Sequence, residues 1–384
     1  MRDELIGTYE FDVSLVYFKD SHVLQHQWIA MFNPEGANFS DISANLKISI
    51  AVQGPGDEQI QLKDQEGPDK PGQQVLMPAQ IKKEFSQLKI RFIQAQHLPN
   101  LDIMGTIDAM ITTEFFGKKW KTKATTAKDN IAAIEQEFWI PIQLPLASDR
   151  LVLDLWDQDK ASLEKVGSMF FSLKELLAKG APEGGYFYWQ NIYGAPVDRG
   201  GPVATMMNNN PECASAWKGR ILMHIDSKDS KHPEKREQNL EEGIKQRALN
   251  EGLFQPKQYT VIAEVGQGIC LAGAKKYKVM IKIADKEFLT KDPVENKKGY
   301  CRWSERFKTE TFESEYSSRD QMDKVIVYLM DGNNPVCYWK GPITDFYDKD
   351  PDYKWLSMKN DLAIGKVSND YEAGMIQVKM TILD

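Results

Sequence analysis

Short runs in which apolar and polar residues alternate recur along the whole chain, with turn residues between them. Such alternation predicts β-strands, because successive side chains of a strand point to opposite faces of a sheet. Among these runs are 87–93, 151–156, 259–265 and 324–330. So many short strands at this spacing predict an all-β chain of tandem antiparallel β-sandwiches.

The order of these runs repeats, which indicates repeated domains. Each copy has a glycine segment, then a tryptophan, then a closing strand. The glycine segments are 5–13, 165–173 and 339–343, the tryptophans are Trp28, Trp189 and Trp355, and the closing strands are 46–52, 219–225 and 374–380. We expect the C-terminal half of a sandwich at 1–54, a linker at 55–85, a complete sandwich at 86–228, a charged and partly helical linker at 229–256, and a second complete sandwich at 257–384.

The first copy lacks the opening strands that the other two copies have. Half a sandwich leaves an unpaired strand edge and an open core, and both cost stability. Two explanations stay open at this point. Either the first residues are a fragment or are placed differently, or another surface supplies the missing strands.

Composition narrows the function classes. The chain has 384 residues, with 48 Lys and Arg against 55 Asp and Glu, and the net charge of 48 − 55 = −7 disfavours a nucleic-acid partner. We expect no transmembrane segment and no signal peptide, because the apolar runs are short. The four cysteines form no C-x-x-C pair, which is typical of a reducing compartment. Since no phosphate-binding loop, nucleophile elbow or kinase motif occurs, we expect a binding protein and no enzyme.

The complete sandwich at 86–228 carries acidic residues in loops that its fold brings to one end. Asp102 and Asp108 lie in one loop, Asp157 and Asp159 follow a central strand, and Glu164 comes shortly before Gly167. Converging carboxylate oxygens suit Ca²⁺, which takes roughly six to eight oxygen ligands. Turns also favour Asp, so plain solvated loops are the alternative.

These motifs resemble those of the C2 domain family. The first acidic loop reads D-x-x-G-x-x-D, the second reads W-D-x-D, and an acidic residue precedes V-G. More closely, L-I-G-T-Y-E-F-D-V, N-L-K-I-S-I-A-V-Q-G-P-G-D, W-Q-N-I-Y-G-A-P and W-K-G-R-I-L are similar to ferlins. The similarity extends over residues 1–226, and the last domain resembles a C2 domain only in its general layout.

The resemblance implies a Ca²⁺ site made by five acidic residues: Asp102, Asp108, Asp157, Asp159 and Glu164. Glu164 stands where the family has Asp, and Ala109 follows Asp108 where the family usually has Pro. In the last domain, 265–268 has no carboxylate and 331–334 keeps one. We therefore expect no Ca²⁺ in that domain.

Two sets of residues are candidate lipid contacts. Apolar loop residues suit shallow insertion among lipid headgroups, or else they cap the end of the sandwich: Ile103, Met104, Ile107 and Leu163. Four lysines surround Trp120 and form a basic stripe: Lys118, Lys119, Lys121 and Lys123. Each lysine contributes about 1 kcal/mol near an anionic phosphoinositide surface. A solvated sheet face is the alternative for this stripe.

The resemblance implies a non-enzymatic, ferlin-like protein that docks on anionic phospholipid membranes, with Ca²⁺ control, in membrane trafficking or fusion. It would act in the cytoplasm at the periphery of a membrane. The alternative is a structural scaffold that uses C2 domains for protein–protein contacts in a large ciliary or cytoskeletal assembly. The loss of acidic loops from the last domain favours this alternative.

Overall fold

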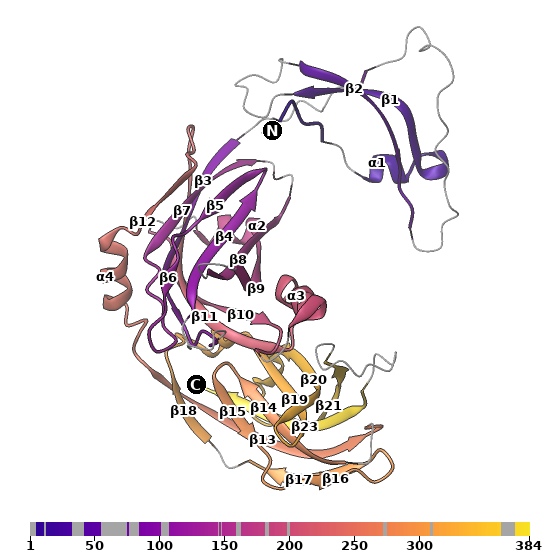
Figure 1. Ribbon diagram of the computed structural model, residues 1–384, viewed down its shortest axis with the longest axis vertical. Coiled ribbons are helices and arrows are strands. Elements are labelled where there is room, and N and C mark those ends of the chain that lie inside the picture. The colour runs from indigo at the N-terminus through magenta and orange to yellow at the C-terminus, as the bar shows by residue number, and fades with distance from the viewer. Residues whose placement is uncertain are drawn as a thin grey trace. The chain divides into compact units, whose positions relative to one another are not determined.

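The computed structural model describes most of the chain and divides into two compact units, residues 1–84 and 85–384. Figure 1 labels their helices and strands. The described residues are 5–10, 13–32, 42–54, 75–76, 84–100, 107–144, 146, 148–158, 163–180, 184–197, 200–271, 275–307, 310–361 and 373–384.

The first unit contains an antiparallel pair of strands, β1 (Val23–Phe32) and β2 (Ile42–Ala51). A short helix, α1 (Ser14–Tyr17), and a 3-10 turn, η1 (Asp20–His22), precede β1. Several large apolar side chains of this unit are exposed: Leu5, Ile6, Val13, Phe18, Ile42 and Leu46. A single strand pair buries too little area for independent stability. That residues 1–54 are half of a sandwich stays a prediction.

The second unit begins with a sandwich of two antiparallel sheets. Its strands are β3 (Glu84–Gln96), β4 (Asp108–Phe115), β5 (Lys118–Lys121), β6 (Thr125–Thr126), β7 (Gln136–Leu144), β8 (Arg150–Gln158), β9 (Leu163–Ser172), β10 (Tyr186–Gly194), β11 (Ala216–Asp229) and β12 (Arg236–Asn239). One sheet has the order β10-β11-β3-β7-β12, and the other has the order β5-β4-β8-β9, with β6 paired to β4. Helices α2 (Leu173–Gly180) and α3 (Gly201–Asn209) lie before and after β10.

Alternation in the sequence places one face of each strand in the core. In β8, Leu151, Leu153 and Leu155 are buried, and the residues between them are only partly covered. They share a cluster with Phe92 and Phe138 of the opposite sheet, whose ring centroids lie 5.0 Å apart. Burial of such a side chain contributes roughly 1.5–3 kcal/mol. The predicted all-β sandwich class is confirmed.

A second sandwich follows. Its strands are β13 (Lys257–Ile269), β14 (Lys276–Ile283), β15 (Lys286–Leu289), β16 (Val294–Glu295), β17 (Cys301–Arg306), β18 (Glu310–Ser314), β19 (Lys324–Asp331), β20 (Asn334–Pro342), β21 (Lys354–Ser357), β22 (Lys359–Asn360) and β23 (Met375–Leu383). One sheet has the order β17-β13-β23-β21, with β18 also on β13, and the other has the order β15-β14-β19-β20-β22, with β16 on β14. Two 3-10 turns, η2 (Arg319–Met322) and η3 (Ile343–Phe346), complete it.

The charged segment between the sandwiches is partly helical, as expected, in α4 (Glu242–Asn250). It also supplies the edge strand β12, which pairs antiparallel with β7 from Arg236 opposite Trp139 to Asn239 opposite Gln136. The sequence pattern does not predict β12. Its four residues, R-E-Q-N, have no apolar alternation, so only the neighbouring strand defines them as β-structure.

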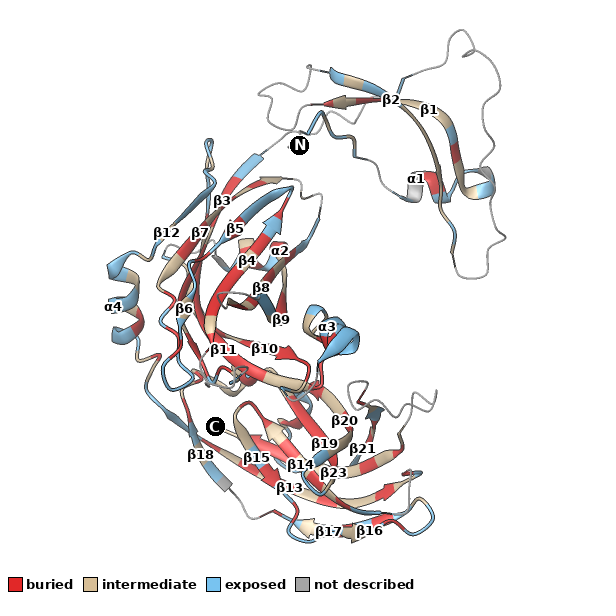
Figure 2. Cartoon of the chain, in the orientation of Figure 1, coloured by how far each residue is buried: buried red, intermediate tan, exposed pale blue. Residues whose placement is uncertain are grey.

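The two sandwiches share one continuous apolar cluster. Ile93 of β3, Trp189 of β10 and Leu222 of β11 pack with the core residues of the second sandwich. Every residue of β11 from Lys218 to Ile225 is buried, and Figure 2 shows buried residues along β10 and β11. A strand that is covered on both faces does not need alternation, which explains the run I-L-M-H-I in β11.

Asn191 of β10 makes three hydrogen bonds at this boundary, and two of them, with Tyr316 and Gln321, cross to the second sandwich. Its side-chain oxygen accepts from the Trp217 indole at 2.9 Å and from the Tyr316 hydroxyl at 2.5 Å. Its amide nitrogen donates to the backbone carbonyl of Gln321 at 2.7 Å. Burial raises the pKa of the Tyr316 hydroxyl well above its ordinary value, so this group stays a neutral donor.

Arg220 of β11 is the buried charge at this boundary. Its guanidinium lies 4.3 Å from the ring centroids of both Trp189 and Tyr316. It donates to the Gln96 side-chain oxygen at 2.7 and 3.0 Å and forms an ion pair with Glu315 at 3.0 Å. A buried charge is tolerated only with such partners, and those of Arg220 come from both sandwiches.

Candidate functional site

The fold brings three of the predicted acidic residues to one end of a sheet in the first sandwich. Asp157 lies near the end of β8, opposite Ala109 of β4 and opposite Glu164 of β9. Asp108 begins β4, and its backbone N–H donates to the Asp157 carboxylate at 2.8 Å. Antiparallel pairing of β4, β8 and β9 therefore gathers carboxylates that are up to 56 residues apart in sequence.

These carboxylates already have neighbours within the protein. Asp157 is buried, and Asp108 accepts a hydrogen bond from the Thr126 hydroxyl at 2.5 Å. Within the described ranges, no group of three or more His, Cys, Asp or Glu residues is arranged to hold a metal ion. Asp102 and Asp159, the other two predicted ligands, lie outside the described residues. Carboxylate oxygens, such as those at this end of the sheet, are the ligands that Ca²⁺ prefers.

The predicted apolar lipid contacts fall into different environments. Ile107 is buried in the core of the first sandwich, as the capping alternative expects. Leu163, at the start of β9, is 53% exposed. Ile103 and Met104 lie outside the described residues. Of the four, Leu163 is the residue that the described structure leaves open to a lipid surface.

The basic stripe lies on β5 and the segment after it. Lys118, Lys119, Lys121 and Lys123 are exposed, whereas Trp120 is buried and donates from its indole to the Trp139 carbonyl at 2.9 Å. Lys119 also forms an exposed ion pair with Glu114 at 3.3 Å.

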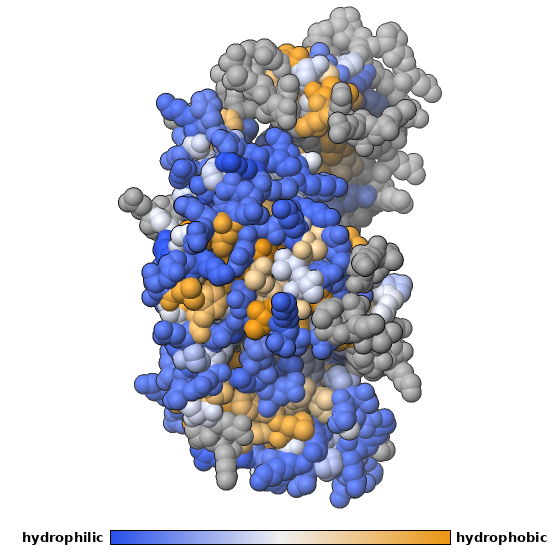
Figure 3. All heavy atoms as spheres, turned by 60° about the vertical axis from the view of Figure 1, so that its left-hand side comes forward, coloured by the Kyte–Doolittle hydropathy of each residue, from blue (hydrophilic) through white to orange (hydrophobic). Residues whose placement is uncertain are grey.

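Lys235, in the segment before β12, adds a further cation at this place, 5.3 Å from the Trp120 ring centroid. The sequence analysis did not find it, because Lys235 lies more than a hundred residues after the stripe. Figure 3 brings the β12 side forward and shows mainly hydrophilic residues there.

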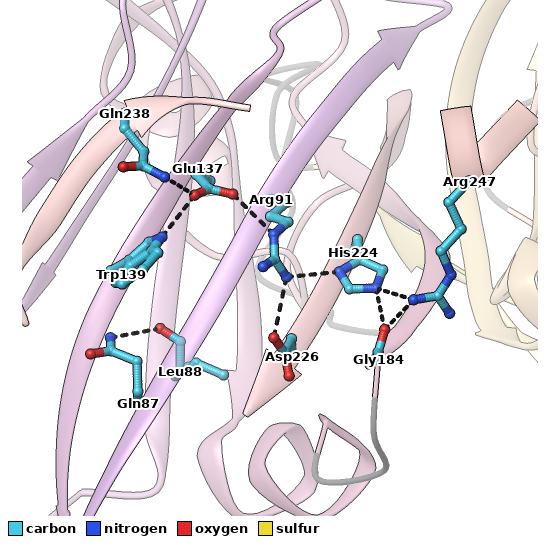
Figure 4. A network of polar contacts seen from close by, with 10 residues as sticks. All are labelled: Gln87, Leu88, Arg91, Glu137, Trp139, Gly184, His224, Asp226, Gln238 and Arg247. Carbon is cyan, nitrogen blue, oxygen red and sulfur yellow. Dashed lines mark hydrogen bonds and ion pairs between the residues drawn. The ribbon is translucent and has the colours of Figure 1, made fainter. Parts of the chain in front are cut away.

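A row of buried polar side chains crosses the outer face of the sheet β11-β3-β7-β12 (Figure 4). Arg91 donates to the Glu137 carboxylate at 2.9 Å, and both side chains are at most 5% exposed. The Trp139 indole donates to the other oxygen of Glu137 at 2.8 Å, and the Gln238 amide donates to the same oxygen. The row attaches β12 to the sheet.

His224 continues the row toward α4. Its Nδ1 lies 3.1 Å from the Arg91 guanidinium, and its Nε2 lies 2.8 Å from the Gly184 carbonyl, which also accepts from Arg247 of α4. Burial, with a smaller contribution from Arg91 and Arg247, lowers the pKa of His224 to about 4. The imidazole is therefore neutral near pH 7 and accepts from Arg91 at Nδ1 while donating from Nε2. Because each charge in the row has a partner, the row supports the fold.

Comparison with known proteins agrees with this architecture. Residues 86–188 match the model of the C2 domain family. The chain is 25% identical to myoferlin of Xenopus tropicalis over 197 residues, which are 46% of this chain and 10% of that protein. It is 23% identical to ferlin 1 of Toxoplasma gondii over 233 residues, which are 58% of this chain and 16% of that protein. This chain is a C2-domain protein with distant similarity to ferlins.

The C2-domain chain therefore spans a small part of the length of these curated relatives. Among solved structures it is similar to the calcium-bound pair of C2 domains of extended synaptotagmin 2. That match has 14% identity and a TM-score of 0.27, and it covers 78% of this chain and 96% of the other. Where the structure describes the chain, no helix is both long and apolar enough to cross a membrane.

The two sandwiches of this C2-domain protein can be aligned strand by strand. The N–H of Ile111 donates to the Thr122 hydroxyl at 2.9 Å, and the N–H of Val279 donates to the Thr290 hydroxyl at 3.0 Å. Both residues lie on the second strand of their sandwich, β4 and β14. Ile111 and Val279 are therefore equivalent positions.

The same alignment locates the second sandwich's counterpart of the acidic end. Ile111 pairs with Leu155, and Val279 pairs with Leu329. Two residues after these leucines come Asp157 and Asp331, respectively. Three residues before Ile111 and Val279 come Asp108 and Lys276. One acidic position is kept in the second sandwich, and the other has become a lysine.

Asp331 forms an ion pair with Lys275, the neighbour of Lys276. The hydrogen bond and charge of Asp331 raise the pKa of Lys275 above its ordinary value. The second sandwich thus places a protein cation beside the carboxylate that corresponds to Asp157.

Proposed function

We propose that this chain is a non-enzymatic C2-domain protein that docks on anionic membranes with the help of Ca²⁺, in ferlin-like membrane trafficking or fusion. It would act as a peripheral protein on the cytoplasmic face of a membrane. The observation that carries the proposal is the hydrogen bond from the Asp108 backbone N–H to the Asp157 carboxylate at the end of β4 and β8, with Glu164 opposite Asp157.

A divalent cation at this end of the sheet would draw the carboxylates toward one centre and offset their mutual repulsion. Asp108, Asp157 and Glu164 would supply oxygens to Ca²⁺, and Asp102 and Asp159 are proposed as the remaining ligands. The cation would also place positive charge at the end of the sandwich that bears the exposed Leu163. Positive charge beside an apolar tip suits the headgroup region of an anionic bilayer.

The basic stripe provides a second attraction to the same membrane. All four of its lysines are exposed, and Lys119 shares its charge with Glu114 in an exposed ion pair. Each lysine contributes about 1 kcal/mol near an anionic surface, and salt screens this attraction over a Debye length of ~8–10 Å. We expect the stripe to strengthen docking at low salt without responding to Ca²⁺.

Co-sedimentation with phosphatidylserine-containing vesicles tests the proposal. We expect the chain to sediment with the vesicles in Ca²⁺ and to stay in the supernatant in chelator. Asp157→Asn keeps the size and the hydrogen-bond acceptor of the side chain but removes its charge, so it should abolish the calcium-dependent part. Asp331→Asn is the matched control, because it makes the same change at the equivalent position of the other sandwich, and it should leave sedimentation unchanged.

A second readout does not involve the membrane. A ligand present at about 100 times its Kd stabilises the folded state by about 2.7 kcal/mol, so Ca²⁺ should raise the melting temperature of the wild type and of Asp331→Asn. It should have little effect on Asp157→Asn. No shift in the wild type at millimolar Ca²⁺, together with equal sedimentation in Ca²⁺ and chelator, would refute the calcium-dependent function.

A structural scaffold in a large ciliary or cytoskeletal assembly is the second candidate. The observation in its favour is that this chain already uses the outer face of a C2 sheet for protein packing, through Trp189, Leu222 and Arg220. In addition, the carboxylate of the second sandwich is paired with Lys275. Absence of vesicle binding under all conditions, with co-purification of a stoichiometric protein partner, would favour the scaffold.

A further inference from the structure

A pocket of about 150 Å³ lies where the loop after α3 of the first sandwich meets the second sandwich. Residues of three neighbouring strands line it: Lys324 of β19, Tyr338, Lys340, Gly341 and Pro342 of β20, and Lys359 of β22. Glu212 from the loop of the first sandwich completes the lining. None of these residues belongs to the predicted ion or lipid sites.

Strand pairing explains why three lysines share this pocket. Lys324 lies opposite Pro342 across β19 and β20, and Lys359 lies opposite Tyr338 across β20 and β22. Lys340 is two residues from both Tyr338 and Pro342 along β20, so the three residues share one face of the sheet. The lysines thus converge from adjacent strands although the sequence separates them.

Lys340 is held in place by the other sandwich. Its ammonium donates to the backbone carbonyls of Pro211 and Ala214 at 2.5 and 2.6 Å, and the neighbouring Tyr338 hydroxyl donates to the Cys213 carbonyl at 3.2 Å. An ammonium has three N–H donors, so one remains for a further acceptor. Burial lowers the pKa of Lys340 to about 8, which leaves it mainly protonated at pH 7.

The lysines of the pocket differ in how far they are paired. The Lys324 ammonium lies 3.5 Å from the Asp323 carboxylate, whereas the exposed Lys359 ammonium has no ion pair within the described part of the protein. The lining contains three ammonium groups and one carboxylate, that of Glu212. A concave site with a surplus of one sign of charge concentrates its field and attracts ions of the opposite sign.

The size and lining of the pocket restrict the ligand. The space is large enough to admit an oxyanion such as phosphate. Tyr338 is the only aromatic residue of the lining, and its hydroxyl is already engaged. Lysines act as point charges toward phosphate oxygens, and three converging ammonium groups match a doubly charged group with three free oxygens.

We infer that this pocket binds a phosphate group, either inorganic phosphate or the phosphomonoester of a lipid headgroup, through Lys324, Lys340 and Lys359 at the boundary of the two sandwiches. Glu212 opposes binding by repulsion. The group would add a bridge between the two sandwiches, because Lys340 is itself bonded to the first sandwich.

The test titrates inorganic phosphate into the whole chain by calorimetry at constant ionic strength, in the absence of Ca²⁺. We expect saturable binding, which Lys359→Gln weakens by about five-fold or more. Glu212→Gln should strengthen binding, because it removes the one carboxylate of the lining. Lys291→Gln is the control: this exposed lysine of the same sandwich does not line the pocket, and the variant should bind phosphate as the wild type does.

Vesicles of phosphatidylcholine with phosphatidic acid, a phosphomonoester, compared with phosphatidylglycerol, a phosphodiester, separate the two sources. A preference for phosphatidic acid that Lys359→Gln removes identifies a lipid headgroup, and phosphate binding without this preference identifies the free ion. No saturable binding of either form up to about 10 mM, or equal weakening by Lys359→Gln and Lys291→Gln, overturns the proposal. Because Ca²⁺ and Asp157 are not involved, this outcome is independent of the membrane-docking test.

Discussion

The two sandwiches of this chain have the same frame but differ in charge at one of two equivalent strand ends. In both, a buried threonine hydroxyl accepts from the second strand, Thr122 from Ile111 and Thr290 from Val279. In the first sandwich, Asp157 lies beside Asp108, whereas in the second Asp331 is paired with Lys275. The frame therefore tolerates either arrangement.

The residues that differ in charge are separate from those that form the two cores. The carboxylates lie at strand ends, outside the leucine and phenylalanine cores, so exchanging Asp for Lys there does not disturb packing. A carboxylate at this end can be balanced by positive charge nearby. The second sandwich supplies it from its own chain, and we propose that the first obtains it from Ca²⁺.

The largest expected effect tests whether the sandwiches are independent. Asn191→Ala should lower the free energy of unfolding by about 3–4 kcal/mol, because it leaves the Trp217 indole, the Tyr316 hydroxyl and the Gln321 carbonyl without partners at the boundary. Urea unfolding followed by tryptophan fluorescence measures the change. The exposed Asn239→Ala on the same sheet should change stability by less than about 0.5 kcal/mol. Equal stability of the two variants would mean that the hydrogen bonds of Asn191 at the boundary contribute nothing to the free energy of unfolding.

Between pH 6.5 and 4, acid should lower the free energy of unfolding through the first sandwich, because residues 257–384 contain no histidine. The pKa of His224 is about 4 in the folded chain and 6.5 in its ordinary state, so the unfolded chain binds the proton first as pH falls. Stability should therefore decline between pH 6.5 and 4, by about 2–3 kcal/mol from this residue.

Urea unfolding at neutral pH and near pH 4.5 measures the loss, and His224→Gln should make it smaller. His232→Gln removes an exposed histidine and should leave the pH dependence unchanged. The idea fails if His224→Gln and the wild type lose the same stability on acidification.

The shared frame predicts equal costs for equivalent substitutions. Thr122→Val and Thr290→Val each leave a buried backbone N–H without its acceptor, so each should cost about 1–2 kcal/mol. Since the two sites lie in different cores, the double variant should lose the sum, to within about 0.5 kcal/mol. Chemical denaturation of the three variants measures this. Costs that differ by several-fold would show that the two frames are not equivalent.

The smallest effect concerns the ion pair of the second sandwich. Lys275→Gln should leave the melting temperature unchanged, because both Lys275 and Asp331 are exposed and such pairs gain little in water. Thermal unfolding with and without Ca²⁺ measures it. A clear loss of stability would show that this ion pair supports the fold of the second sandwich. The charges at the acidic ends of the two sandwiches would then not be separable from the fold.

Sequence reasoning predicted the parts of the molecule that depend on local pattern. The alternation in 151–156 predicted β8 with its buried Leu151, Leu153 and Leu155, and the acidic motifs identified Asp108, Asp157 and Glu164 before strand pairing brought them together. It missed Lys235 beside Trp120, edge strand β12 and the lysine pocket. These features depend on partners that are far apart in sequence, and no local periodicity records them.

By itself, the sequence determined that the chain is all-β, that its domains repeat, and which residues have oxygen and ammonium groups at strand ends. Those properties follow from side-chain period and residue chemistry. Only the tertiary structure decided that Ile107 is buried, that the outer faces of β10 and β11 are covered, and that Arg220 is paired with Glu315. The physical reason is that burial and charge pairing belong to surfaces in contact, and contact between distant segments exists only after the sheets have formed and packed.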